Sequence, residues 1–336
     1  INGWAIESRI YAEDPSRGFL PSSGRISQYV EPCGGENIRI DSGVYEGAEV
    51  SMFYDAMIAK LCSYGKNRDE AIFHMENALN AFAIDGVSHN LNFLEAIMKN
   101  KKFKNGDIST NFIKEEFPKG FSGSQLDSSD KKHLIATALF IFFCNFIRNS
   151  KITGKVNNRE KQINDIWIVE INDDSYLVNI TTKEQNYYEF SCDNQNIRVK
   201  SSWQNGQKIF HGLVNDINIS VKIKDNNLTG GYLFQHAGAD IFANVYSPRT
   251  AELKKFMPKI EKNIKPTTLK SPITGKIIKF KVRKGDIVKS GQELLTIEAM
   301  KMENSIRSDY DIKVKEINFK NGDNVGVGQI IIEFEK

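Results

Sequence analysis

The feature that most limits the fold of this chain is an internal repeat near its C-terminus. The stretch GKIIKFKVRKGDIVKSGQELLTIE, from Gly275, aligns with DIKVKEINFKNGDNVGVGQIIIEFE, from Asp311, at an offset of 37 residues. The matched positions are Gly285-Asp286 with Gly322-Asp323, Gly291-Gln292 with Gly328-Gln329, and Glu298 with Glu335. Self-similarity of this kind predicts two superposable halves of one small β structure.

The connection between the two halves carries the stretch Glu298, Ala299, Met300, Lys301, Met302. A lysine that another enzyme must modify needs a fixed backbone and an amine that stands clear of the fold, and a tight hairpin provides both. The repeat places Lys301 at such a hairpin. The flanking methionines form a flexible apolar collar that a modifying enzyme or a partner surface can recognise. We therefore expect Lys301 to be a covalent attachment site.

Residues Glu298 to Met302 and the surrounding repeat resemble the biotinyl domain of biotin-dependent carboxylases. The resemblance implies that biotin protein ligase attaches biotin to Lys301, with Glu298, Ala299, Met300 and Met302 as the binding context, and that the amide removes the lysine charge. A tethered cofactor visits two active sites at a raised effective concentration. Lipoyl domains share this fold and are the alternative for this domain alone, but their usual Asp-Lys-Ala context is absent.

Residues 1–118 mix strand-like and helical patterns, which predicts an α+β fold. Short strands are expected at Ile38 to Ile40 and at Val50 to Tyr54. Apolar residues at spacings of three and four predict an amphipathic helix over Arg68 to Ile84. A second helix follows and ends near the basic stretch from Lys99 to Lys104.

This part resembles the C-terminal subdomain of biotin carboxylase. The stretches that carry the resemblance are ESRIYAEDP from Glu7, FLPSSGRI from Phe19, NIRIDSGVY from Asn37 and FYDAMIAKL from Phe53. In that family the arginine that matches Arg39 holds the biotin ureido oxygen. A guanidinium at this place stabilises the negative charge that develops when the ureido nitrogen loses its proton. The alternative for Arg39 is a surface ion pair on a strand.

The sequence lacks the features that bind ATP in that family. It has no glycine-rich phosphate loop, no magnesium-binding glutamates and no Gln-Val-Glu-His stretch for bicarbonate. It opens at Ile1 in an apolar strand-like stretch without an initiator methionine, which is unusual for a natural domain. We therefore expect a C-terminal portion that is inactive alone, with the ATP, Mg and bicarbonate sites of the full-length subunit upstream.

The middle of the chain predicts a sheet wrapped around a helix. Leu134 to Ile147 is an apolar run of 14 residues, shorter than the roughly 20 that span a bilayer, so a buried core helix is expected rather than a membrane anchor. From Trp167 to about Val245, eight short alternating runs are separated by Asn, Asp and Gly turns, which is typical of an antiparallel sheet or barrel. Neither part could otherwise bury its apolar face.

This region resembles the domain that joins the carboxylase and carboxyltransferase subunits in propionyl-CoA carboxylases. The stretches that carry this resemblance are GDISTNFI from Gly106, FPKGF from Phe117, SSW from Ser201 and AELKKFM from Ala251. It implies a carboxyltransferase beta subunit as partner, bound through an exposed loop or strand edge, and delivery of the carboxyl group to propionyl-CoA. The alternatives are a methylcrotonyl-CoA or other acyl-CoA carboxylase alpha subunit, or a non-catalytic carrier and assembly module.

Charge and cysteine content narrow the partners and the compartment. The 45 basic and 42 acidic residues nearly cancel, so no global field favours nucleic acid or a membrane surface. The cysteines form no CxxC pair and have no histidine at metal-ligand spacing: Cys33, Cys62, Cys144 and Cys192. We expect free thiols, no metal site, and a bacterial cytoplasm or mitochondrial matrix.

Together these patterns predict a multidomain α+β chain of four segments. Residues 1–118 form the C-terminal part of a biotin carboxylase domain, and residues 119–257 a β-barrel around a long helix. Residues 258–270, polar and with two prolines, form a linker. Residues 271–336 form a small pseudo-symmetric β-sandwich, the biotinyl domain.

Overall fold

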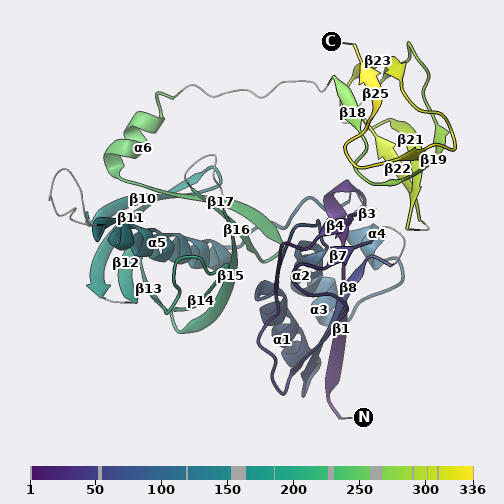
Figure 1. The fold of residues 1–336 in the computed structure, drawn as a ribbon. Helices are drawn as coiled ribbons and strands as arrows, with labels where there is room; N and C mark the ends of the chain where they lie inside the picture. The colour runs from purple at the N-terminus through teal and green to yellow at the C-terminus, as the bar shows by residue number, and fades with distance from the viewer. Residues whose placement is uncertain are drawn as a thin grey trace.

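The described part of the chain forms three domains that follow one another along the sequence (Figure 1). Each has a large hydrophobic core, and a small fourth cluster surrounds Phe93. The computed structural model describes residues 2–51, 55–118, 120–152, 164–184, 186–225, 231–257, 267–289, 291–300, 302–308 and 310–335. Residues 258–266 of the predicted linker lie outside this range.

The first domain is a three-stranded antiparallel sheet with helices against one face. Its elements are β1 (Trp4–Tyr11), β2 (Glu13–Asp14), η1 (Pro15–Arg17), β3 (Leu20–Pro21), β4 (Gly24–Arg25), β5 (Gln28–Val30), β6 (Ile38–Ser42), β7 (Glu49–Val50), β8 (Met57–Gly65), α1 (Arg68–Asn80), β9 (Ala83–Asp85), α2 (Leu91–Lys99), α3 (Lys101–Asn105) and α4 (Phe112–Glu116). The sheet order is β1, β8, β6. Leu61 and Ser63 of β8 face the core, where the Ser63 hydroxyl donates to the Ala71 carbonyl of α1.

The helix α1 begins as its sequence predicts and ends earlier. The Asn67 side chain caps it by accepting from the Glu70 amide at 2.9 Å. The predicted end at Ile84 is wrong, because Ala83–Asp85 leaves the helix and pairs with Gln28–Val30. The apolar spacing alone would continue the helix, but pairing with a strand that is distant in sequence decides the structure of these residues. Of the strand predicted over Val50 to Tyr54, β7 contains only Val50, and residues 52–54 are not described.

The second domain is a closed antiparallel barrel of eight strands around a helix. Its elements are α5 (Ser128–Ser150), β10 (Ile166–Ile171), β11 (Asp174–Glu184), β12 (Tyr187–Cys192), β13 (Gln195–Ser201), β14 (Ile209–Val214), β15 (Ile217–Asp225), β16 (Tyr232–His236), β17 (Ala239–Tyr246) and α6 (Pro248–Lys254). Each strand pairs with the next, and β10 closes the ring by pairing with β17. The predicted barrel is confirmed.

The helix α5 supplies the centre of the barrel core. Phe140 is fully buried and packs edge-on against Tyr188 and Phe210, with ring centroids 5.5 and 5.4 Å apart. Asp127 and Asp130 form a capping box at the first turn. Among the described helices, α5 alone is long and apolar enough to cross a membrane, and half of its most apolar stretch is buried inside the protein. Its apolar residues therefore serve the barrel core, as predicted.

The third domain is a sandwich of two four-stranded sheets. Its elements are β18 (Thr268–Lys270), β19 (Gly275–Phe280), β20 (Ile287–Val288), β21 (Glu293–Ala299), β22 (Met302–Arg307), β23 (Ile312–Ile317), β24 (Asn324–Val325) and β25 (Ile330–Phe334). The strands β19 and β20 recur as β23 and β24 at the 37-residue offset of the repeat.

The two halves of the sandwich bind each other reciprocally. The Gly285 amide donates to the Val314 carbonyl at 2.8 Å, and the equivalent Gly322 amide donates to the Ile277 carbonyl at 2.7 Å. These two hydrogen bonds are equivalent under the 37-residue offset of the repeat. The predicted pseudo-symmetric sandwich is confirmed.

A buried ion pair joins the first domain to the barrel. Glu95 of α2 and Lys222 of β15 lie 2.5 Å apart, with side chains 1% and 3% exposed. The second Glu95 oxygen accepts from the Gly238 amide at 2.7 Å, in the turn between β16 and β17. Gly238 has a φ of +79°, and an added Cβ would lie 2.7 Å from the Asn92 carbonyl oxygen. The barrel turn is therefore held tightly against α2.

Removal of one partner of this pair should destabilise the protein strongly. Lys222→Met leaves the Glu95 carboxylate buried without a counter-charge, which typically costs about 3–5 kcal/mol. The measurement is urea unfolding of the full chain. The matched control is Lys315→Met, whose partner Glu333 is 3.1 Å away at the surface, where we expect little change. Equal unfolding midpoints for the two variants would show that the buried pair does not hold the domains.

Candidate functional site: the carrier hairpin and the Arg39 face

The predicted hairpin is present where the two halves of the sandwich meet. Ala299 of β21 pairs directly with Met302 of β22, so the loop contains only Met300 and Lys301. Met300 has a φ of +50°, a left-handed conformation that two-residue hairpin loops require. Lys301 itself lies outside the described residues. The structure thus describes the two strand ends and Met300, and the role of Lys301 stays a prediction.

The four predicted context residues have different surroundings. Ala299 is buried in the core of the sandwich, and Glu298 is exposed opposite Glu303. Met302 is 40% exposed, while Met300 is partly buried and packs against the core of the first domain. The apolar collar is therefore asymmetric, with one methionine facing solvent and the other in a contact.

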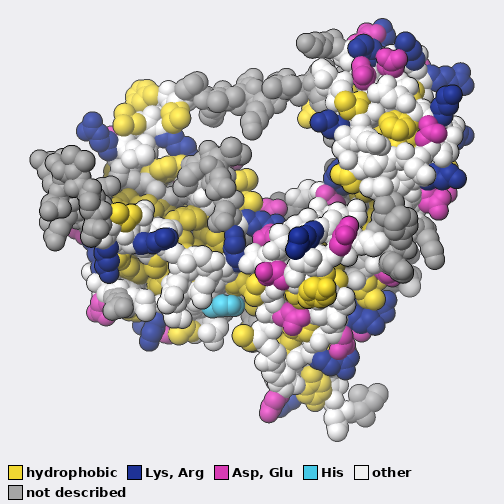
Figure 2. Space-filling view, viewed as in Figure 1, with side chains coloured by type: hydrophobic (Ala, Val, Ile, Leu, Met, Phe, Trp, Pro, Cys, Tyr) yellow, Lys and Arg dark blue, Asp and Glu magenta, His cyan; other side chains and the backbone are white. Residues whose placement is uncertain are grey.

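The hairpin end of the third domain lies against the first domain. Met300 reaches the core of the first domain, and Leu20 of β3, which is 6% exposed, belongs to the apolar core of the sandwich. Figure 1 shows the β21–β22 end pointing toward the part of the chain that contains β3 and β4. In the space-filling view the two domains are in contact on the visible face (Figure 2).

Arg39 lies on the open face of the three-stranded sheet. Strand register places it in one row with Cys62 of β8 and Glu7 of β1. The adjacent row on the same face contains Asp41, Lys60 and Arg9. The sequence motifs singled out Arg39 alone. Period-two spacing puts Glu7 and Arg9 on one face, but only the strand order brings them beside Arg39.

The charges on this face pair locally. Arg39 Nη2 lies 3.1 Å from Asp41 Oδ2 and donates to Cys62 Sγ at 3.9 Å. Arg9 Nε donates to Glu7 at 3.0 Å, and this hydrogen bond is the main reason that the pKa of Glu7 lies below its usual value. Both described contacts of Arg39 use one nitrogen, and the side chain is 72% exposed. The rest of the guanidinium can therefore donate to a ligand oxygen.

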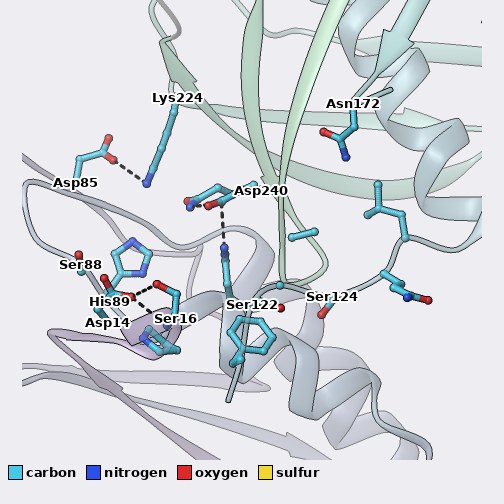
Figure 3. A pocket seen from close by; sticks show the side chains of 18 of the residues that line it. Asp14, Ser16, Asp85, Ser88, His89, Ser122, Ser124, Asn172, Lys224 and Asp240 are labelled. Atoms are coloured by element: carbon cyan, nitrogen blue, oxygen red, sulfur yellow. Dashed lines mark hydrogen bonds and ion pairs between the residues drawn. The ribbon is translucent and has the colours of Figure 1, made fainter. Parts of the chain in front are cut away.

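A polar cavity of about 1040 Å³ lies between the first domain and the barrel (Figure 3). In its wall, Asp85 lies 3.8 Å from Lys224, and the Asp240 carboxylate accepts from the side-chain amide of Asn92 at 3.0 Å. Burial lowers the pKa of His89, also in the wall, to about 3, so its ring is neutral. Neither Arg39 nor the carrier hairpin lines this cavity, so it is separate from both. Its walls come from distant parts of the chain, and no local sequence signal marks it.

Comparison with known proteins assigns each domain to a family. Residues 7–115 match the biotin carboxylase C-terminal domain, and residues 134–259 match the propionyl-coenzyme A carboxylase BT domain. Residues 267–334 match the family described as biotin-requiring enzyme.

Whole-chain relatives agree with these matches. The chain is 38% identical, over its full length, to the propionyl-CoA carboxylase alpha chain of Ruegeria pomeroyi, of which it covers 52%. It is 35% identical, again over its full length, to the mitochondrial propionyl-CoA carboxylase alpha chain of Sus scrofa, of which it covers 47%. The chain therefore spans about half the length of the curated relatives it matches.

Among solved structures, the chain is similar to the biotin carboxylase domain of the Hydrogenobacter thermophilus 2-oxoglutarate carboxylase, which was solved in complex with MgADP, ADP and bicarbonate. That structure is 40% identical, covers 34% of this chain and 25% of its own, and has a TM-score of 0.34. The domain order and the whole-chain relatives together identify the family: this chain is a homologue of the propionyl-CoA carboxylase alpha chains and corresponds to their C-terminal part, with biotin carboxylase C-terminal, BT and biotinyl domains.

Proposed function

We propose that this chain carries biotin on Lys301 and serves the carboxylation of propionyl-CoA as part of an alpha subunit. The observation that carries the proposal is the two-residue loop of Met300 and Lys301 at the junction of the two symmetric halves. Biotin, when bound, supplies a ring nitrogen that transports a carboxyl group between active sites. The chain itself supplies a carrier whose backbone is fixed on both sides of the attachment point.

The residues around the loop fit an attached biotin. Buried Ala299 anchors the last residue of β21, and the cross-strand pair Ala299 and Met302 fixes the separation of the strands. The exposed Glu298 and Met302 leave this side of the hairpin open to a ligase. The conversion of the lysine amine to an amide also removes its charge, which suits a loop with apolar neighbours.

Loss of Lys301 should abolish biotin loading. Coexpression of the chain with biotin protein ligase should add one biotinyl group, visible by intact mass, and Lys301→Ala should add none because no amine is present at the loop. Lys279→Ala, at an exposed position of the neighbouring strand β19, is the matched control and should load normally. A biotinyl increment that persists in Lys301→Ala would place the attachment elsewhere.

We propose further that Arg39 donates to the ureido oxygen of biotin in the carboxylase reaction. Its support is the open sheet face, where Arg39 is 72% exposed and Arg9 and Lys60 add positive charge. A cationic donor at the oxygen lowers the cost of proton removal from the adjacent nitrogen. ATP, Mg and bicarbonate would bind to parts of the full-length subunit beyond this chain.

Arg39→Ala in the full-length subunit should slow carboxylation of free biotin by about 10²–10³-fold, the usual effect of removing one donor to developing charge. Arg39→Lys should recover only part of the rate, because lysine lacks the planar fork of donors. The control is Arg198→Ala, an exposed barrel arginine paired with Asp216. An unchanged rate in Arg39→Ala would reduce Arg39 to the alternative role, a surface ion pair with Asp41.

The barrel is the part we propose to bind the carboxyltransferase beta subunit. Its support is the match of residues 134–259 to the BT domain. All eight described strands close into one ring, so the barrel offers no free strand edge. Of the two predicted docking modes, an exposed loop or a strand edge, we therefore favour an exposed loop. On the visible face of the barrel, Lys and Arg side chains lie among hydrophobic ones (Figure 2).

The co-purified complex should carboxylate propionyl-CoA faster than methylcrotonyl-CoA or acetyl-CoA, since the acyl-CoA site resides in the partner that the barrel selects. The measurement is carboxylation of each acyl-CoA by the complex of full-length subunit and partner. Deletion of residues 120–257 should abolish co-purification. A preference for methylcrotonyl-CoA would favour the alternative that the chain belongs to a methylcrotonyl-CoA carboxylase. A complex that carboxylates none of the three would favour the alternative of a non-catalytic assembly module.

We propose a bacterial cytoplasm or mitochondrial matrix as the location, in line with the relatives.

A further inference from the structure

Three potential metal ligands meet where the barrel joins the first domain. Asp130 lies in the first turn of α5 and His133 in the second, and His236 ends β16. One ligand atom of each, a carboxylate oxygen or a ring nitrogen, lies within 4.8 Å of the others. Asp130 and His236 are each only 5% exposed. No step of the proposed carboxylation uses any of them.

The hydrogen bond of His236 fixes which ring nitrogen is free. Nδ1 lies 3.0 Å from the Ser220 carbonyl oxygen, which can only accept, so Nδ1 carries the proton. In the neutral imidazole with this tautomer, the proton is on Nδ1 alone. Nε2 therefore presents a lone pair, and it lies 3.7 Å from Asp130 Oδ1. Two acceptors face each other, and a cation between them would satisfy both.

The hydrogen bonds to the Asp130 carboxylate leave a lone pair for such a cation. Lys99 Nζ lies 2.7 Å from both carboxylate oxygens, and the Asp127 amide donates to Oδ2 at 3.2 Å. A carboxylate has about four lone-pair sites, so Oδ1 retains one beside its bond to Lys99. The ammonium shares the carboxylate and repels a metal ion, which limits the affinity of the site without blocking it.

His133 completes the set. Its spacing of three residues from Asp130 puts both side chains on one face of α5. Its ring centroid is 6.3 Å from that of His236, at an angle of 79°. Within the described part of the chain, neither ring nitrogen of His133 has a hydrogen-bond partner, so both are available to a ligand. A neutral imidazole with a free nitrogen is the form that binds metal.

We propose that Asp130, His133 and His236 bind one divalent transition-metal ion, with Zn²⁺ as the type, at the joint between the first domain and the barrel. Two imidazole nitrogens and one carboxylate oxygen form a donor set that suits zinc better than magnesium or calcium, with water as the fourth ligand. Bonds of about 2.0–2.2 Å in a tetrahedron place ligand atoms about 3.3–3.6 Å apart. Asp130 Oδ1 and His236 Nε2, at 3.7 Å, are already close to this separation. The ligand atom of His133 lies within 4.8 Å of the other two and has to approach by up to about 1.5 Å.

His236 Nδ1 donates to the Ser220 carbonyl. Histidines that bind metal through one ring nitrogen usually donate the other N–H in this way, and the hydrogen bond fixes the orientation of the ring. The ion would tie the start of α5 to the end of β16, next to the Lys99 contact from α2. The sequence prediction of no metal site considered only cysteine motifs and local spacing. These ligands are separated by about a hundred residues, from Asp130 to His236.

The test is metal titration of the full chain after chelator treatment. Calorimetry with Zn²⁺ should show one site per chain, and Co²⁺ should give the visible spectrum of a four-coordinate ion. His133→Ala and His236→Phe should each weaken binding by at least about 10-fold, since even partners beyond the ligands change affinity by 10–100-fold. His74→Ala, on α1 in the first domain, is the matched control and should bind as the unaltered chain does.

A second readout protects the test against misfolding. Zn²⁺ should raise the thermal unfolding midpoint of the unaltered chain and of His74→Ala, because an ion that binds only the folded state stabilises it. At the same Zn²⁺ concentration it should raise the midpoint of His133→Ala less. The His133 side chain is only partly buried, so the fold should tolerate its loss. The absence of uptake at high micromolar Zn²⁺ would overturn the proposal, as would His133→Ala and His236→Phe variants that bind Zn²⁺ as tightly as the unaltered chain.

Discussion

The buried ion pair between Glu95 and Lys222 governs how the first two domains meet. Both side chains are almost completely excluded from water, and such a pair seldom adds net stability because desolvation offsets the attraction. Its effect is on geometry. Any other docking of barrel and helix would leave two bare charges in an apolar interior, so one arrangement is selected. The turn at Gly238, the Lys99 contact with Asp130 and the polar cavity all depend on that arrangement.

The third domain follows a different physical rule. Its strands are held by reciprocal hydrogen bonds, such as Gly285 to Val314 and Gly322 to Ile277, which come from within the domain. It needs no neighbour to fix the Met300 loop. The contacts with the first domain that the structure describes are apolar, through Met300 and Leu20, and apolar contacts are not directional. A rigid hairpin on a domain with non-directional contacts suits a group that must visit more than one site.

Sequence reasoning recovered what repetition and alternation encode. The 37-residue repeat predicted the sandwich and its hairpin, and eight alternating runs predicted the barrel. It missed what distant pairing decides. The predicted end of α1 was wrong because Ala83–Asp85 pairs with a strand far away in sequence. For the same reason the sequence revealed neither the charged row beside Arg39 nor the meeting of Asp130 with His236.

The proposed biotin loading also changes how the carrier meets the Arg39 face. This face presents three cations, Arg9, Lys60 and Arg39, and two acids, Glu7 and Asp41, so its local charge is positive. An unmodified amine on the hairpin carries a positive charge and is repelled at short range, whereas the biotinyl amide is neutral. In the proposed role of Arg39, the ureido oxygen of biotin would then bring partial negative charge to the guanidinium. Electrostatics therefore favours the approach of the loaded carrier over that of the unloaded one.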